Sequence, residues 1–281
     1  MSDFGYSTGA TRLKTYGGVA GTSLGTTITA PGAANTKGNW APIVASTDFP
    51  AVGIIVSIQV EPGSGDSYCL IDVGVGAGGV EIVLIPNLLA TRYGTSDGGR
   101  WSVYVPVAIP AGTNVSMRYQ ASGTAPVIYG TITIVGGQAK RQLLSPGLCT
   151  DYGSVTGTSK GTAVDPGATA NTESGWQPLT ASTTYACRGL ILCVAANTCG
   201  SGTNPRWLVD VAVGAGGAEQ AVVTDIIHSN GGQSAGIHFS DGGWHYLPMA
   251  IPAGTRVSVQ AQCSINTASD RALNVNVIGV S

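Results

Sequence analysis

The chain has 281 residues and a formal net charge of −2, and only 10% of its residues are charged, against about a quarter in ordinary soluble proteins. This charge, with Lys140-Arg141 as the one basic pair that stands out, leaves no electrostatic drive toward nucleic acid. No apolar stretch approaches the roughly 18 residues that a membrane span needs, and residues 1–14 lack the apolar core of a secretion signal, so neither class is expected.

The same passage is written twice along the chain. The copies begin at Tyr16 and Tyr152, and their longest shared string, Ala-Ile-Pro-Ala-Gly-Thr, occupies residues 108–113 and 250–255. The offset between matched blocks grows along the chain, as it does when surface loops accept a few extra residues. The repeat therefore predicts four segments: an N-terminal arm at 1–15, a first domain at 16–136, a linker at 137–150 and a second domain at 151–281.

Both copies read as strands and turns. β-Branched runs are cut by Gly, Pro, Asn and Asp, and helical periodicity is absent. In the first copy this pattern predicts eight strands, near residues 25–30, 40–46, 51–60, 68–75, 80–86, 101–108, 113–121 and 126–135. Eight short strands in about 120 residues are typical of a sandwich or jelly roll. The fold class expected is all-β, with two tandem antiparallel β-sandwich domains, jelly-roll-like, from an internal repeat.

Two features bear on how these domains are covered. Residues 54–58 (Ile-Ile-Val-Ser-Ile) are nearly continuous in apolar character, which predicts a strand covered on both faces, in part by the other domain or by another subunit. Trp40 and Trp176 are matched between the copies, and we expect both in the core. The six cysteines are not at shared positions, so they are not a disulfide framework on which the fold depends.

Two motifs that could carry chemistry have simpler interpretations. Residues 74–79 satisfy Gly-x-Gly-x-x-Gly, but a strand follows where a dinucleotide site needs a helix, so we expect a hairpin turn and no cofactor. Asp72 and Asp210 are matched carboxylates that could do acid-base work, yet each domain has one, which favours a turn or backbone-capping role. Because no nucleophile, zinc-protease or P-loop motif is present, we expect no enzyme activity.

The three histidines, His228, His238 and His245, all lie in the second copy. A zinc site would need them to converge and usually needs a tighter spacing, so we expect loop residues that donate hydrogen bonds and no metal.

Aromatic and polar side chains gather in the loop ahead of Ala-Ile-Pro-Ala-Gly-Thr. An aromatic face beside a carboxylate and a donor is the composition of a sugar-binding surface, because apolar sugar faces stack on rings. The alternative, which we favour for the rings, is packing at the end of the sandwich or in a subunit contact. The candidate glycan contacts are Tyr93, Asp97, Trp101, His238, Asp241, Trp244 and His245.

Several strings together resemble a known module. They are residues 34–40 (Ala-Asn-Thr-Lys-Gly-Asn-Trp), the Asp-x-Gly-Val-Gly-Ala-Gly-Gly-x-Glu block at 72–81, Ile-Pro-Asn-Leu at 85–88, and residues 107–113. This pattern resembles a β-rich module common in virion structural proteins of tailed bacteriophages, and the resemblance covers nearly the whole chain twice. The second copy departs from it, with Thr-Asp-Ile-Ile at 224–227 in place of Ile-Pro-Asn-Leu.

The resemblance implies a non-enzymatic virion protein, made in the bacterial host cytoplasm and exposed on the outside of a particle. The leading hypothesis is a fibre, spike or tail-associated component that contacts host-surface glycan. The alternative is a capsid decoration (cement) protein that clamps the head shell, and a third, a carbohydrate-binding module of an enzyme system, lacks a secretion signal and a catalytic partner. Expected partners are other virion proteins and further copies of this chain, since particle components follow the particle's symmetry.

Overall fold

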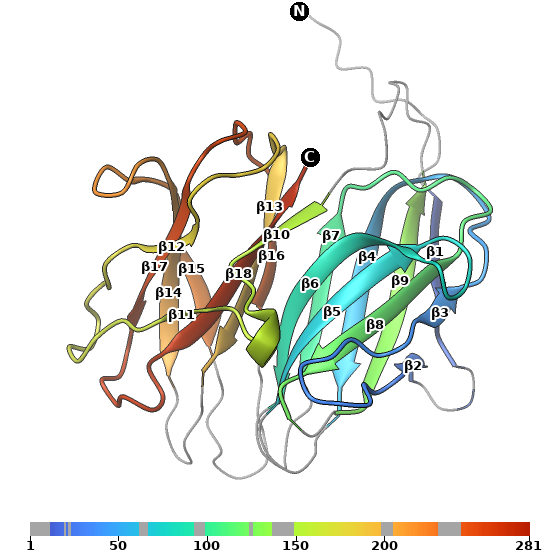
Figure 1. The fold of residues 1–281 in the computed structure, drawn as a ribbon, viewed down its shortest axis with the longest axis horizontal. Coiled ribbons are helices and arrows are strands. Elements are labelled where there is room, and N and C mark those ends of the chain that lie inside the picture. The colour runs from blue at the N-terminus through green and yellow to red at the C-terminus, as the bar shows by residue number, and fades with distance from the viewer. Residues whose placement is uncertain are drawn as a thin grey trace, which may run out of the picture.

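The computed structural model describes residues 12–19, 21, 24–61, 67–92, 99–123, 126–136, 149–197, 205–229 and 243–281. Over these residues it contains eighteen strands, one short 3₁₀ helix (Thr156–Thr158) and only antiparallel strand pairing, which confirms the all-β prediction. The strands form two sandwiches that lie side by side (Figure 1). No helix in these ranges is long and apolar enough to cross a membrane.

Module 1, defined as residues 12–136, has a front sheet and a back sheet. The front sheet has the order β1-β9-β4-β7, with β2 on β9, and comprises β1 (Arg12–Tyr16), β2 (Thr26–Ile28), β4 (Ala51–Val60), β7 (Arg100–Val105) and β9 (Ile128–Gly136). The back sheet has the order β3-β8-β5-β6 and comprises β3 (Ala41–Val44), β5 (Ser67–Val75), β6 (Ile82–Arg92) and β8 (Val115–Ala121). One side of this sandwich therefore ends in β6 and β7.

Module 2, defined as residues 149–281, repeats this arrangement. Its front sheet has the order β10-β18-β13-β16, with β11 on β18, and comprises β10 (Cys149–Tyr152), β11 (Thr162–Val164), β13 (Gly189–Ala196), β16 (Gly243–Leu247) and β18 (Leu273–Val280). Its back sheet has the order β12-β17-β14-β15 and comprises β12 (Gln177–Thr180), β14 (Arg206–Val213), β15 (Gln220–Ser229) and β17 (Val257–Cys263). Strand for strand, β6 corresponds to β15 and β7 to β16.

All eight strands predicted for the first copy are present, but β1 was not predicted. It pairs with β9 from Arg12 onward, so residues 12–15 belong to module 1 and not to a free arm. The corresponding strand β10 likewise begins at Cys149, inside the predicted linker. Both strands escaped the repeat comparison because RLKTY and CTDY share little besides their final tyrosine.

Strand β6 is longer than the predicted 80–86 and continues past Pro86. Asn87 makes this possible by taking a left-handed conformation (φ 52°), at a register shift between β5 and β6. The glycine-rich segment before β6 is the turn of the β5–β6 hairpin, as predicted, and Gly76 and Gly79 have positive φ there.

One hydrophobic cluster extends from module 1 into module 2. It contains the buried residues of module 1 together with Cys149, Ile191, Cys193, Ala195, Trp244, Ile278 and Val280 of module 2. A second cluster lies inside module 2 and includes the opposite side of β13, at Leu190, Leu192 and Val194. The two central strands of the front sheet of module 2, β13 and β18, are therefore buried on both faces, with module 1 covering one of them.

Trp40 and Trp176 are only half-buried, so the prediction that both belong to the core is wrong. The Trp40 ring lies under the Arg118 guanidinium, 4.3 Å from its carbon to the ring centroid, and over Gly74, where a Cβ would approach the ring at 2.6 Å. Stacking on a cation and a glycine holds this indole at the surface.

Candidate functional site: the inter-module interface and the open sheet face

Trp101 and Trp244 meet between the two modules. Their ring centroids are 6.4 Å apart, and the side chains are 3% and 4% exposed. The Trp244 indole donates its Nε1 hydrogen to the backbone oxygen of Leu89 on β6 at 2.6 Å. These rings cannot stack on a glycan in this arrangement, so their assignment as glycan contacts is corrected to packing, the alternative raised by the sequence.

The other candidate contacts divide into two groups. Tyr93, Asp97, His238 and Asp241 lie outside the described residues. His245 is half-buried on β16, and burial lowers its pKa.

His228, expected in a loop, lies instead on β15, buried and 5.5 Å from the Trp207 ring. Burial lowers the pKa of His228 to about 4, with a smaller contribution from His245. Within the described residues no group of three or more His, Cys, Asp and Glu side chains could hold a metal ion.

A polar cluster joins the modules beside these rings. Asp151 on β10 accepts hydrogen bonds from the amides of Asn87 and Asn276, each at 2.9 Å, and from the Ser154 hydroxyl at 2.8 Å. Asn276 also donates to the backbone oxygen of Asn87 at 2.9 Å. Burial raises the pKa of Asp151, and these donors partly offset that shift. The cluster fixes the left-handed turn of β6 against the front sheet of module 2.

The matched carboxylates cap this turn in each module, as the sequence predicted. Asp72 accepts the backbone N–H of Asn87 at 3.0 Å, and Asp210 accepts that of Asp225 at 2.7 Å. Asp225 has the same left-handed conformation as Asn87, with φ 58°. Asp72 also binds Lys37 at 2.7 Å, and burial lowers the pKa of that lysine. These contacts give both carboxylates a structural role.

The outer face of the front sheet, the side turned away from its own back sheet, differs between the modules. Gly53 and Gly189 occupy matched positions, because each lies against a tyrosine, Tyr104 or Tyr246, with which a Cβ would collide. We therefore align the two sheets at these glycines. From this alignment the strand registers place Ser57, Thr131 and Ser102 in one row of module 1, and Cys193, Asn276 and Trp244 in the corresponding row of module 2.

In module 2 this face is covered, whereas in module 1 it is open as far as the described part of the chain goes. Strand β4 alternates, with Ile54, Val56 and Ile58 buried and Ile55 and Ser57 half-buried, whereas all eight residues of β13 are buried. Within the chain, module 2 does not cover residues 54–58, and the strand buried on both faces is their counterpart β13. Cover of residues 54–58 by another subunit stays a prediction. An alignment of the two copies would have shown which strand is covered on both faces, because polar residues of β4 align with apolar residues of β13.

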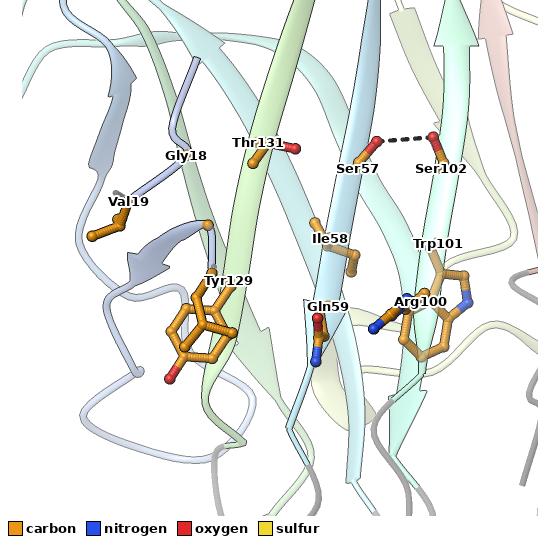
Figure 2. A pocket seen from close by; sticks show the side chains of 12 residues that line it. Gly18, Val19, Ser57, Ile58, Gln59, Arg100, Trp101, Ser102, Tyr129 and Thr131 are labelled. Carbon is orange, nitrogen blue, oxygen red and sulfur yellow. Dashed lines mark hydrogen bonds between the residues drawn. The ribbon is translucent and has the colours of Figure 1, made fainter. Parts of the chain in front are cut away.

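A hollow of about 800 Å³ lies on the open face of module 1 (Figure 2). Ser57 and Ser102 share a hydrogen bond at 2.9 Å on its floor. Val19 and Leu24 supply an aliphatic wall beside Gly18 and Gly25. The other lining residues come from β4, β7 and β9, and are Ile58, Gln59, Arg100, Trp101, Tyr129 and Thr131. This hollow is a place in module 1 where a ligand or a partner side chain could be held.

No protein-family model matches the chain, and no curated protein matches it by sequence. Among solved structures, PNGF-II is similar at a TM-score of 0.39 and 10% identity, over 91% of this chain and 64% of that one. The CBM22-1-CBM22-2 tandem domain of Paenibacillus barcinonensis Xyn10C gives 0.28 and 8%, over 97% and 93%.

The structure of infectious bursal disease virus, Gt strain, gives a TM-score of 0.25 and 11% identity, over 96% of this chain and 72% of that one. For PNGF-II, the first of these structures, this chain spans less than two thirds of the other chain's length. Since none of these TM-scores reaches 0.5, the likeness assigns neither a family nor a function to the chain.

Proposed function

We propose that this chain is a non-enzymatic structural protein on the outer surface of a tailed bacteriophage or phage-like particle, and that it acts there as a fibre, spike or tail-associated component. Its partners are other virion proteins and further copies of itself. The observation that carries the proposal is the shared core, in which the Trp101–Trp244 contact and the Asp151 cluster join the two modules into one block. A double module joined in this way suits an element that projects from a particle and withstands mechanical force.

The position of the chain in purified particles tests this proposal. Density mapping, or immunogold labelling with an antibody raised against module 2, should place it on the tail or at the vertices. Label spread evenly over the head would overturn the tail assignment in favour of the alternative, a decoration protein that cements the shell. Particles without the chain would contradict both.

Contact with host-surface glycan is the second candidate function, and the hollow of module 1 is the observation that favours it. Tyr129 offers a ring for stacking, while Gln59, Arg100 and the serine pair offer hydrogen-bond partners for sugar hydroxyls. On a glycan array, Tyr129→Ala should abolish binding, whereas Tyr185→Ala, a change at a 47% exposed tyrosine outside the hollow, should not. Equal binding by both variants would rule out the hollow as the glycan site.

A further inference from the structure

The interface between the modules uses one surface of each. Each module also has the surface that corresponds to the one its neighbour contributes, and the interface does not use that surface. Module 2 places the outer face of its front sheet over the side of module 1 that ends in β6 and β7. Among the described residues, none forms such a cover on the corresponding side of module 2, along β15, and no strand lies on the corresponding sheet face of module 1. Each chain therefore carries one free copy of each half of an interface that it already uses internally.

Strand β15 has the exposed apolar side chains that this interpretation requires. Leu89 on β6 is 0% exposed under module 2, whereas Ile227, at the corresponding position of β15, is 71% exposed. Val222 on the same strand is 43% exposed. The correspondence rests on the capped left-handed residues, Asn87 and Asp225, which precede Leu89 and Ile227 by two positions. An aliphatic side chain this exposed on an edge strand is typical of a contact surface.

The register identifies what β15 would meet on the open face. Inside the chain, Leu89 accepts the indole hydrogen of Trp244 on its backbone oxygen and belongs to the same hydrophobic cluster as that ring. Asn87 is hydrogen-bonded to Asp151 and Asn276. The corresponding residues of module 1 are Ser102 for Trp244, Thr15 for Asp151 and Thr131 for Asn276. Ser102 in place of a tryptophan leaves room, and the hollow lies at this position. Ile227 would thus enter a space that an indole fills in module 2.

The polar groups are complementary once their roles are exchanged. In the internal interface the carboxylate belongs to the sheet face (Asp151) and the amide donor to the strand (Asn87). On β15 the strand carries the carboxylate, Asp225, and the open face of module 1 carries hydroxyl donors, Thr15 and Thr131. On the face of module 2, the residue that corresponds to Thr15 is Asp151, and its carboxylate would repel Asp225. The open face of module 1 therefore accepts β15 better than the face of module 2 would.

We propose that β15 of one chain docks on the open sheet face of module 1 of a second copy of this chain, with Ile227 in the hollow. The contact is head-to-tail, because it joins two different surfaces and repeats the relation that the two modules have within one chain. Such contacts close into a ring when the rotation permits and otherwise extend as a filament. This inference deepens and rests on the proposed role as a multi-copy structural protein, but it is tested separately.

Sedimentation velocity of the native chain tests the contact in solution. We expect concentration-dependent association, and Ile227→Glu should weaken it on the order of 100-fold, because the change places a carboxylate that must be desolvated where an aliphatic side chain packs. Ile82→Glu is the matched control: Ile82 is 74% exposed on β6 outside the interface, and the same change there should leave association intact. A native chain that stays monomeric, or equal effects of the two variants, would overturn the inference.

A mixing experiment establishes that the contact is head-to-tail. Ile227→Glu blocks the strand side, and Ser102→Glu blocks the hollow, so each variant alone should be monomeric. An equimolar mixture should form pairs of chains and stop there, since one intact strand and one intact hollow remain. A mixture that stays monomeric would contradict the proposal. Self-association of the Ser102→Glu variant on its own would also contradict it, because a symmetric β15–β15 contact would not involve Ser102. A monomeric native chain that binds glycan in the hollow would likewise overturn it, and none of these results depends on where the protein lies in particles.

Discussion

The two front sheets have the same strand order and face opposite environments. In module 2 the outer face carries Cys193, Trp244 and Ile278 and is buried under module 1. In module 1 the corresponding face carries Ser57, Ser102 and Thr133, and it borders a hollow. The repeat therefore preserves the sandwich while changing the chemistry of one face, and that change separates a packing surface from an available one.

The largest loss in the free energy of unfolding should come from removing the indole of Trp244, which packs between the covered face of module 2 and module 1. Trp244→Ala removes a buried indole and its hydrogen bond to Leu89, and should lower the free energy of unfolding by about 4 kcal/mol. Trp176→Ala, at a half-buried ring in the same module, should cost under about 1 kcal/mol. Denaturant titration measures both, and equal losses would mean that Trp244 is not part of a packed interface.

Replacing the two matched capping carboxylates should lower the free energy of unfolding by different amounts, with the larger loss at Asp72. Asp72→Ala leaves Lys37 and Arg118 without their buried carboxylate, and should cost about 3 kcal/mol. Asp210→Ala removes bonds to a backbone N–H and to Gln260, and should cost about 1 to 2 kcal/mol. If Asp210→Ala proves the more damaging change in denaturant titration, the ion pairs to Lys37 and Arg118 do not make Asp72 the more important of the two caps.

Acid should destabilise module 2 through His228, which has Ala90 as its counterpart in module 1. The folded pKa of about 4 lies below the ordinary 6.5, so the unfolded chain binds the proton more readily. The stability contributed by neutral His228 is complete above pH 6.5, and about 3 kcal/mol is lost as the pH falls toward 4. His228→Phe should flatten this pH dependence of unfolding; an unchanged slope would show that another group is responsible.

The smallest effects come from exchanging one residue pair between the faces. Ile278→Thr places a hydroxyl in the covered face and should cost about 2 kcal/mol. The reverse change, Thr133→Ile, lies on the open face and should alter the free energy of unfolding by less than about 0.5 kcal/mol. Two similar values would mean that the two faces are equally accessible to water.

The sequence predicted the sandwich class and the eight strands of the first copy because alternation and turn residues are local properties. The backbone-capping role of Asp72 and Asp210 also followed from their matched positions. Packing was the favoured interpretation for Trp101 and Trp244, but the sequence did not identify the surface on which they pack, because contacts between two modules are not a local property of either segment. Strands β1 and β10 were missed since their sequences diverge, although both pair at corresponding edges.

Differential scanning calorimetry of the full chain tests the shared core most directly. If the Trp101–Trp244 contact and the Asp151 cluster join the modules into one block, the chain should unfold in a single transition with equal calorimetric and van't Hoff enthalpies. Two transitions, with Trp244→Ala shifting only one of them, would show that the modules are independent and would contradict this account.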